Sequence, residues 1–191
     1  MPSVLLYLHG FQSSPASLKA TQMAEWVGAH RPDIQVVIPA QPNTPAAAWA
    51  AIEQAIAALP VGCRLGVVGS SLGGFMATRV AERYGCRAVL VNPAVRPHEL
   101  LHDYLGPQQN PYSGEHFELT EAHMQELVEL AVPISAPERL WVLQQQADEV
   151  LDYRKALAEY RFARLTIECE GNHAFVGFER YCAQIVHFLG L

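Results

Sequence analysis

The 191-residue chain has few positively charged residues and no run of them. It carries 13 Lys and Arg against 19 Asp and Glu, and its formal net charge is −6. Proteins that bind a nucleic-acid backbone present a basic patch or stripe that neutralises the phosphates. The composition therefore argues against nucleic acid as a partner.

Long apolar runs are also missing. No uncharged apolar stretch approaches the roughly 20 residues that a membrane-spanning helix needs. The opening MPSVLLYL lacks the basic segment, the longer apolar segment and the cleavage site of a secretory signal peptide. We therefore expect a cytoplasmic protein with no membrane partner.

Cysteines are few and widely spaced, and no two of them form a CxxC pair. This spacing is typical neither of a structural zinc site nor of a disulfide-stabilised secreted domain. We expect no metal, and we expect reduced and mostly buried thiols at Cys63, Cys86, Cys169 and Cys182.

Short, almost continuously apolar runs alternate along the chain with segments of helical spacing. The predicted strands are residues 4–8, 34–38, 64–69, 88–92, 139–145 and 164–169. The predicted helices are residues 17–29, 45–59, 73–84 and 174–189. Continuous apolar strands are typical of a parallel sheet that helices cover on both faces. The alternation predicts a doubly wound α/β fold, and the length fits a single domain over residues 1–191.

One long connection interrupts this alternation. Residues 95–133 separate two predicted strands, although such a connection usually needs far fewer residues. An apolar stripe at helical spacing within it is formed by Met124, Leu127, Val128 and Ala131. The segment is either a surface helix pair that packs on the sheet or a cap over a functional site, because inserted loops in α/β enzymes often shape pockets.

Residues 69–73 read Gly-Ser-Ser-Leu-Gly, which is the pattern G-x-S-x-G. This pattern marks a nucleophile elbow when it follows a strand and opens a helix, and here it lies between RLGVV and GFMATRV. The flanking glycines allow the strand and the helix to approach closely. We therefore predict that Ser71 is a nucleophile beside the positive end of a helix. A plain turn or N-cap serine is the alternative.

A serine hydroxyl becomes a good nucleophile only when a base and an orienting acid assist it. In this motif they follow in the order Ser, Asp or Glu, His. His173 comes just after the last predicted strand, so we expect it at the same sheet edge as the elbow and predict it as the base. Asp148 comes just after the preceding predicted strand and is the predicted acid, with Asp152 second.

The loop after the first predicted strand, LHGFQSSP, is expected to supply a second donor to the oxyanion hole. We predict the backbone N–H groups of Phe11 and Leu72 as the two donors, with Gln12 as the substitute for Phe11. His9 is expected to hold this loop, because a second base would have no separate proton to move.

Other residues are assigned less directly. Phe75, Asn92 and Tyr112 are expected at the substrate pocket, although Asn92 before Pro93 is equally typical of a plain turn at a strand end. Glu149 is expected to point away if Asp148 points inward. Asp103, in the long insertion, is a remaining rival for the role of the acid.

Several long sequence blocks carry a family resemblance. They are YLHGFQSSP at 7–15, GVVGSSLGGF at 66–75, VNPAVRPHELLHDYLG at 91–106, NPYSG at 110–114, QQADEVLDYR at 145–154 and GNHAFVGFERY at 171–181. On these blocks the chain resembles the YqiA-type esterases of the α/β-hydrolase superfamily over nearly its whole length. The resemblance implies a compact hydrolase with the triad Ser71, Asp148 and His173, acting on carboxylic esters and on acyl thioesters of coenzyme A.

The expected function is therefore that of a serine esterase whose partner is a small-molecule ester or acyl-CoA thioester. Acyl transfer through such a triad needs no metal or cofactor. The same triad also serves peptidases and perhydrolases, and a ligand-binding relative without turnover would keep the same residues. The sequence predicts neither the acyl-chain length nor the oligomeric state.

Overall fold

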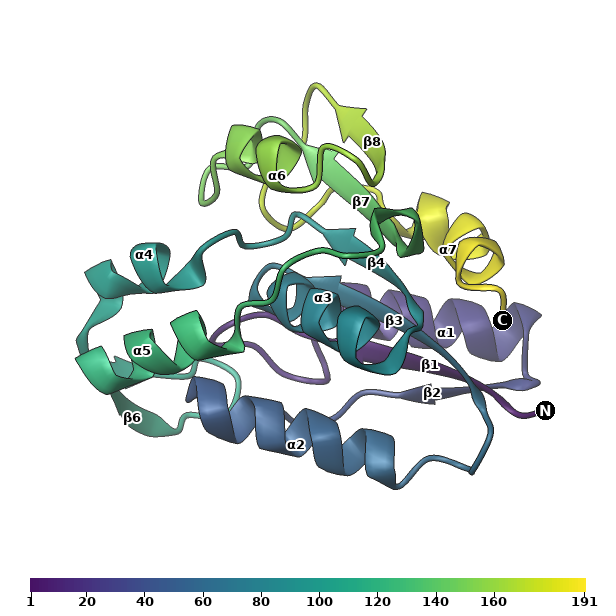
Figure 1. Cartoon of the computed structure of the whole chain (residues 1–191), viewed down its shortest axis with the longest axis horizontal. Coiled ribbons are helices and arrows are strands. Elements are labelled where there is room, and N and C mark those ends of the chain that lie inside the picture. Colours follow the sequence, from purple (N-terminus) through teal and green to yellow (C-terminus); the bar gives the residue numbers. More distant parts are fainter.

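Six parallel strands form the central sheet of the molecule (Figure 1). The computed structural model describes residues 1–191. The strand order across the sheet is β2-β1-β3-β4-β7-β8. The strands are β1 (Ser3–Leu8), β2 (Ile34–Val37), β3 (Arg64–Ser70), β4 (Arg87–Val91), β7 (Leu140–Gln145) and β8 (Arg164–Glu168). All six predicted strands are confirmed to within about two residues at each end.

Helices cover both faces of this sheet, as the continuous apolar strands predict. Along β1, Leu5 and Tyr7 enter one core and Leu6 and Leu8 enter the other, and all four side chains are fully buried. The first core is closed by α1 (Leu18–His30), η3 (Phe178–Tyr181) and α7 (Cys182–Leu189). The second core is closed by α2 (Pro45–Ala57), α3 (Leu72–Tyr84) and α6 (Tyr153–Glu159).

The insertion between β4 and β7, residues 95–133, is called the cap below. Its elements are α4 (Pro97–Leu101), η1 (His102–Tyr104), β5 (Gly106–Gln109), β6 (His116–Leu119) and α5 (Glu121–Leu130), and η2 (Pro137–Arg139) leads from it into β7. Figure 1 shows α4, α5 and β6 together at the end of the molecule away from both termini. A small core of Leu101, Leu119, Met124 and Leu127 packs against Phe11 and Leu72. The cap therefore lies over the elbow and the loop after β1.

Two expectations about local structure need correction. The last helix begins at Cys182 instead of residue 174, because a loop and the short helix η3 precede it and Gly177 has a φ of 75°. The thiols are less buried than predicted: Cys182 is buried, but Cys169 is exposed. Burial raises the pKa of the Cys182 thiol to about 11. None of the helices is both long enough and apolar enough to cross a bilayer.

Candidate active site

Ser71 lies at a sharp turn between β3 and α3. Its backbone has a φ of 55° and a ψ of −121°, a conformation that costs a non-glycine residue about 1–3 kcal/mol. Ser71 is the N-cap residue of α3, yet its side chain makes no capping hydrogen bond. A plain capping serine would use its hydroxyl on the helix backbone. The hydroxyl of Ser71 is therefore free for other partners.

The two glycines of the motif are required by close packing around this turn. A Cβ atom at Gly69 would collide with the carbonyl oxygen of Gly73. A Cβ atom at Gly73 would collide with the carbonyl oxygens of Leu8 and His9 at the end of β1. The strand, the helix and the neighbouring strand therefore approach one another as the motif predicts.

His173 and Asp148 form the hydrogen-bonded pair that the sequence predicts. The imidazole Nδ1 lies 3.0 Å and 2.9 Å from the two carboxylate oxygens. The Asp148 side chain is fully buried, and its Oδ1 also accepts hydrogen bonds from the backbone N–H groups of Val150 and Leu151 at 2.9 Å and 2.8 Å. A carboxylate held in this way keeps the proton of His173 on Nδ1, which leaves Nε2 as the basic nitrogen.

The rival carboxylates lie elsewhere. Asp152 caps α6, where its side chain accepts a hydrogen bond from the Arg154 N–H at 3.0 Å. Asp103 lies in the exposed turn η1. Glu149 contacts the backbone of His173 and not its ring: Oε2 accepts the His173 N–H at 2.9 Å, and this bond lowers the pKa of the Glu149 carboxyl.

Ser71 and His173 face the same two pockets. No hydrogen bond joins the Ser71 hydroxyl to the imidazole in this structure, and such bonds often tighten only when substrate is present. One pocket has a volume of about 200 Å³ and is lined mainly by apolar side chains of the cap and the elbow, including Leu72, Leu100 and Tyr104. The other has a volume of about 370 Å³ and includes polar side chains such as Lys19.

The predicted oxyanion donors lie beside the Ser71 hydroxyl. Phe11 and Leu72 both line the 200 Å³ pocket together with Ser71. Leu72 is the first residue of α3, so its N–H has no partner inside the helix. A Cβ atom built on Gly10 would lie 3.8 Å from the Ser71 Oγ, which shows how closely the loop passes the hydroxyl.

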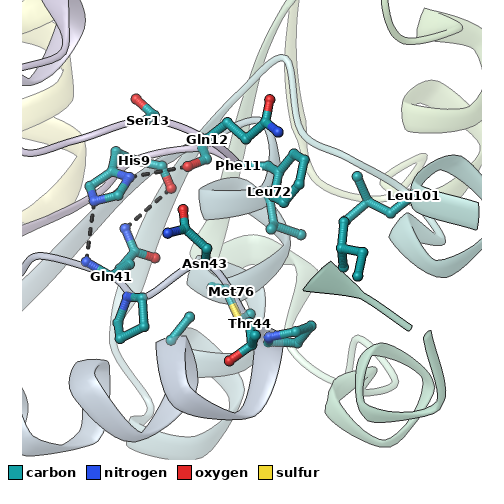
Figure 2. A pocket seen from close by; sticks show the side chains of 15 residues that line it. His9, Phe11, Gln12, Ser13, Gln41, Asn43, Thr44, Leu72, Met76 and Leu101 are labelled. Carbon is teal, nitrogen blue, oxygen red and sulfur yellow. Dashed lines mark hydrogen bonds between the residues drawn. The ribbon is translucent and has the colours of Figure 1, made fainter. Parts of the chain in front are cut away.

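His9 holds this loop in place, as predicted. Its side chain is nearly buried, and the Gln41 N–H donates to Nε2 at 3.3 Å, so the neutral ring carries its proton on Nδ1 and donates it to the Gly10 carbonyl at 3.1 Å. Burial lowers the pKa of His9. Figure 2 shows the ring between the two backbones, where it ties the loop after β1 to the loop after β2.

The pocket drawn in Figure 2 is a separate, smaller space beside the loop after β1. Its volume is about 20 Å³, and neither Ser71 nor His173 lines it. Figure 2 shows Met76 and Thr44 closing it from below and Leu101 closing it from the cap side. It shares Phe11, Gln12, Leu72 and Leu101 with the 200 Å³ pocket, so these four residues lie between the two spaces.

Two of the three predicted pocket residues are placed differently. Tyr112 lines the 370 Å³ pocket and is 56% exposed. Phe75 instead packs against the core of the cap and lines a separate pocket with Thr78, because it lies one helical turn beyond Ser71. Asn92 is fully buried, and its amide is bonded to backbone and side chains behind the site, so it does not line the pocket.

Lys19, near the start of α1, is a site residue that the sequence analysis missed. Its Nζ donates a hydrogen bond to the carbonyl oxygen of Ala174 at 2.8 Å. Burial lowers the pKa of Lys19 to about 8, although the charge of Asp148 acts in the opposite direction. No local motif marks this lysine, because the loop that it contacts is far away in the sequence.

The comparison with protein families covers almost the whole chain. Residues 4–190 match the model of a family described as "Uncharacterised protein family (UPF0227)". The chain belongs to the UPF0227 family. The match agrees with the resemblance to YqiA-type sequences, and it includes the UPF0227 chain's elbow, its cap and the loop that carries His173.

Solved structures share the fold of this UPF0227 chain. Alpha/beta hydrolase domain-containing protein 10 from mouse has a TM-score of 0.75 at 13% identity, and the match covers 98% of this chain and 89% of that one. Est1E from Butyrivibrio proteoclasticus has a TM-score of 0.72 at 12% identity, covering 97% and 86%. An esterase from Pyrococcus furiosus has a TM-score of 0.65 at 14% identity, covering 99% and 82%. The chain has the α/β-hydrolase fold.

Proposed function

We propose that this UPF0227 protein is a serine esterase that hydrolyses carboxylic esters or acyl thioesters. The observation that carries the proposal is the arrangement of three side chains. Asp148 holds the imidazole of His173 through Nδ1, and His173 opens onto the same pockets as the uncapped hydroxyl of Ser71. A buried carboxylate, an imidazole that it orients and a serine on a strained turn are the parts that acyl transfer to serine requires.

In the proposed reaction, Nε2 of His173 takes the hydroxyl proton while the Ser71 oxygen attacks the carbonyl carbon. The N–H groups of Phe11 and Leu72 bind the oxyanion that forms, and each such donor is worth about 3–4 kcal/mol. The C–O or C–S bond then breaks, and the leaving group takes the proton from His173. Water attacks the acyl-enzyme by the same route, which releases the acid and restores Ser71.

The two pockets suggest how a substrate would lie. The acyl group is assigned to the apolar 200 Å³ pocket beneath the cap, where burial of its carbons is favourable. The alcohol or thiol is assigned to the 370 Å³ pocket, whose lining includes Lys19, Ser13 and Glu149. A small-molecule ester or an acyl-CoA thioester with a compact acyl chain fits this division.

Covalent labelling with a fluorophosphonate tests the proposal directly. The wild-type protein should incorporate the label at one site, and Ser71→Ala should incorporate none. The matched control is Ser70→Ala, because Ser70 is the neighbouring serine, but it is the nearly buried last residue of β3 and not the residue of the turn. Ester turnover should follow the label in all three proteins. Equal labelling of wild type and Ser71→Ala, or labelling without turnover of any ester, would contradict an esterase.

A further inference from the structure

The loop that carries His173 is held mainly by side chains from other parts of the fold. Residues 172–176 form neither helix nor strand. Buried backbone groups in such a loop need hydrogen-bond partners, because leaving one unpaired costs about 1–3 kcal/mol. Two buried amides, Asn92 and Gln145, supply most of these partners.

Asn92 holds the loop from the end of β4. Its Nδ2 donates to the carbonyl oxygens of Asn172 at 3.0 Å and of His173 at 3.2 Å. Its Oδ1 accepts the Gln145 N–H at 2.9 Å and the Gln144 side-chain amide at 3.1 Å. The amide is fully buried, and the backbone has a φ of 41°, a conformation that asparagine tolerates better than most residues.

Gln145 holds the loop from the end of the neighbouring strand β7. Its Oε1 accepts the N–H groups of Asn172 at 3.0 Å and of Val176 at 2.9 Å. Its Nε2 donates to the Val176 carbonyl oxygen at 2.9 Å and to the Glu168 carboxylate at 2.6 Å. One side chain therefore fixes the loop on both sides of His173, at its start and at its end.

Gly171 makes room for this amide. A Cβ atom at position 171 would collide with the end of the Gln145 side chain and lie 2.8 Å from its Cγ. The backbone of Gly171 also has a φ of 101°, which only glycine adopts readily. The glycine at position 171, two residues before His173, thus allows the loop to approach the Gln145 side chain closely.

We propose that Asn92 and Gln145 are positioning residues that set the direction of the His173 imidazole. Asp148 fixes one atom of the ring, Nδ1, and the two amides fix the backbone from which the ring projects. Together they constrain where Nε2 points. Neither amide lines the pockets that contain Ser71, so neither touches the reacting atoms. This inference rests on the proposed function.

The test measures turnover in Gln145→Met and Asn92→Asp. Gln145→Met keeps the volume of the side chain and removes its hydrogen bonds to the loop. We expect kcat to fall about 10- to 100-fold while KM changes less than about threefold, because a displacement of about 1 Å in a catalytic group can cost a factor of about 100. Asn92→Asp keeps the shape and both accepted bonds but loses the two bonds donated to Asn172 and His173. If Gln145→Met does not fold, the same measurements on Asn92→Asp test the proposal.

Tyr160→Phe is the matched control. It removes a buried hydrogen bond of similar length, 3.0 Å to Thr78, on the other face of the sheet. It should lower the unfolding midpoint and leave kcat unchanged. Amide hydrogen exchange gives a readout that does not depend on activity: the N–H groups of Asn172 and Val176 should exchange faster in Gln145→Met and at the wild-type rate in Tyr160→Phe.

The outcomes separate this inference from the proposed function. Loss of kcat with faster loop exchange in Gln145→Met, and neither effect in Tyr160→Phe, supports the positioning role. If wild type takes the fluorophosphonate label and the folded amide variants match the kcat of Tyr160→Phe, the positioning role is wrong and the esterase stands. If the wild-type protein is not labelled, the esterase proposal is wrong. The proposed role of the two amides in catalysis is then wrong as well, even if hydrogen exchange shows that they hold the loop.

Discussion

At the scale of single residues, backbone strain gathers around the proposed site. Five non-glycine residues have a positive φ, and four of them lie at the elbow or in the loops beside it: Gln12, Ser71, Asn92 and Phe175. Conformations of this kind persist only where the surrounding contacts hold them, and they are frequent at active sites. Keeping these residues in strained conformations at this edge of the sheet therefore lowers the free energy of unfolding.

The first prediction concerns Gly73, the second glycine of the G-x-S-x-G motif, two residues after Ser71. Gly73→Ala should destabilise the protein by about 3 kcal/mol or more, because the added Cβ meets backbone carbonyls at Leu8 and His9 that cannot move away. Gly28→Ala, in the exposed part of α1 with no atom within 4 Å of the added Cβ, should instead stabilise by about 0.5–1 kcal/mol. Urea denaturation measures both changes. Similar effects at the two positions would contradict the packing described here.

The second prediction tests whether Asp148 or Asp152 is the acid that orients His173. Asp148→Asn should lower kcat by about 10⁴-fold, because an amide favours the wrong tautomer of His173. Asp152→Asn should keep stability within about 0.5 kcal/mol and activity near that of wild type, because asparagine caps a helix about as well as aspartate. Steady-state kinetics with one p-nitrophenyl ester decides the matter. A severe loss in Asp152→Asn alone would transfer the acid role to Asp152.

The contact between Asp148 and His173 could be predicted because each residue lies in the loop that follows an apolar strand, and parallel strands end at one edge of the sheet. The roles of Asn92 and Gln145 could not be predicted in this way. Their partners lie far along the chain, and a polar residue at a strand end is equally typical of a turn. Only the three-dimensional arrangement shows which loop an amide will contact.

At the scale of elements, the hairpin β5–β6 within the cap was not predicted. Its strands GPQQ and HFEL have four residues each and little of the β-branched or apolar character that marks a strand. Their pairing depends on the turn between them, where Gly114 has a φ of 72°. The helix after the hairpin could be predicted, because the apolar stripe at Met124 and Leu127 faces the core of the cap.

Side-chain amides fasten this hairpin to the loop after β1. The Gln12 side chain donates to that of Gln108 at 2.9 Å. The nearly buried Asn110 donates from Nδ2 to the Ser13 carbonyl oxygen at 3.2 Å and to the Asn43 side chain at 2.8 Å. The loop that supplies the proposed oxyanion donor Phe11 is therefore held partly by the cap.

A third prediction follows from these bonds. Asn110→Ala should destabilise the protein by about 1–3 kcal/mol, because partly buried groups of Ser13 and Asn43 lose their hydrogen bonds. It should also lower kcat severalfold, since Phe11 is then less firmly placed. Gln109→Ala is the control: Gln109 is the exposed last residue of β5, directly before Asn110, and its loss should leave both quantities near wild type. A stable Asn110→Ala protein with full activity would show that the cap does not hold the loop.

At the scale of the whole molecule, the apolar pattern alone predicts the sheet and its two covering layers. It does so because residues on both faces of each central strand must be apolar when helices cover both sides. The pockets, unlike the sheet, could not be predicted from the apolar pattern. The 200 Å³ pocket lies where the cap meets the elbow, and the 370 Å³ pocket lies between the loop after β1, the start of α1 and the loop that carries His173. Their volumes therefore depend on how distant segments pack, and no local pattern of residues specifies that.

The fourth prediction uses the size of the apolar pocket. A volume of about 200 Å³ should favour short acyl chains. Turnover of p-nitrophenyl esters should fall for acyl chains longer than about eight carbons, if each carbon fills about 25–30 Å³, close to the liquid volume of one water. Leu100→Ala enlarges the pocket and should move the optimum toward longer chains. Val128→Ala, on the exposed face of α5, should leave the profile unchanged. An identical profile in Leu100→Ala would place the acyl group elsewhere.

The position of the cap in the chain has a consequence for how such a protein can diversify. Between Pro97 and Leu130 no residue contributes to the central sheet, to the elbow or to the Asp148–His173 pair. Changes at exposed positions of this segment, away from Asn110 and from the cap core that packs against Phe11 and Leu72, can accumulate with little effect on the rest of the fold. If the protein is the proposed esterase, natural variation and a laboratory library would both alter substrate preference most readily at such positions. In the proposed esterase, the sheet and the loops at its edge carry the reacting groups, and the cap forms part of the wall of the apolar pocket.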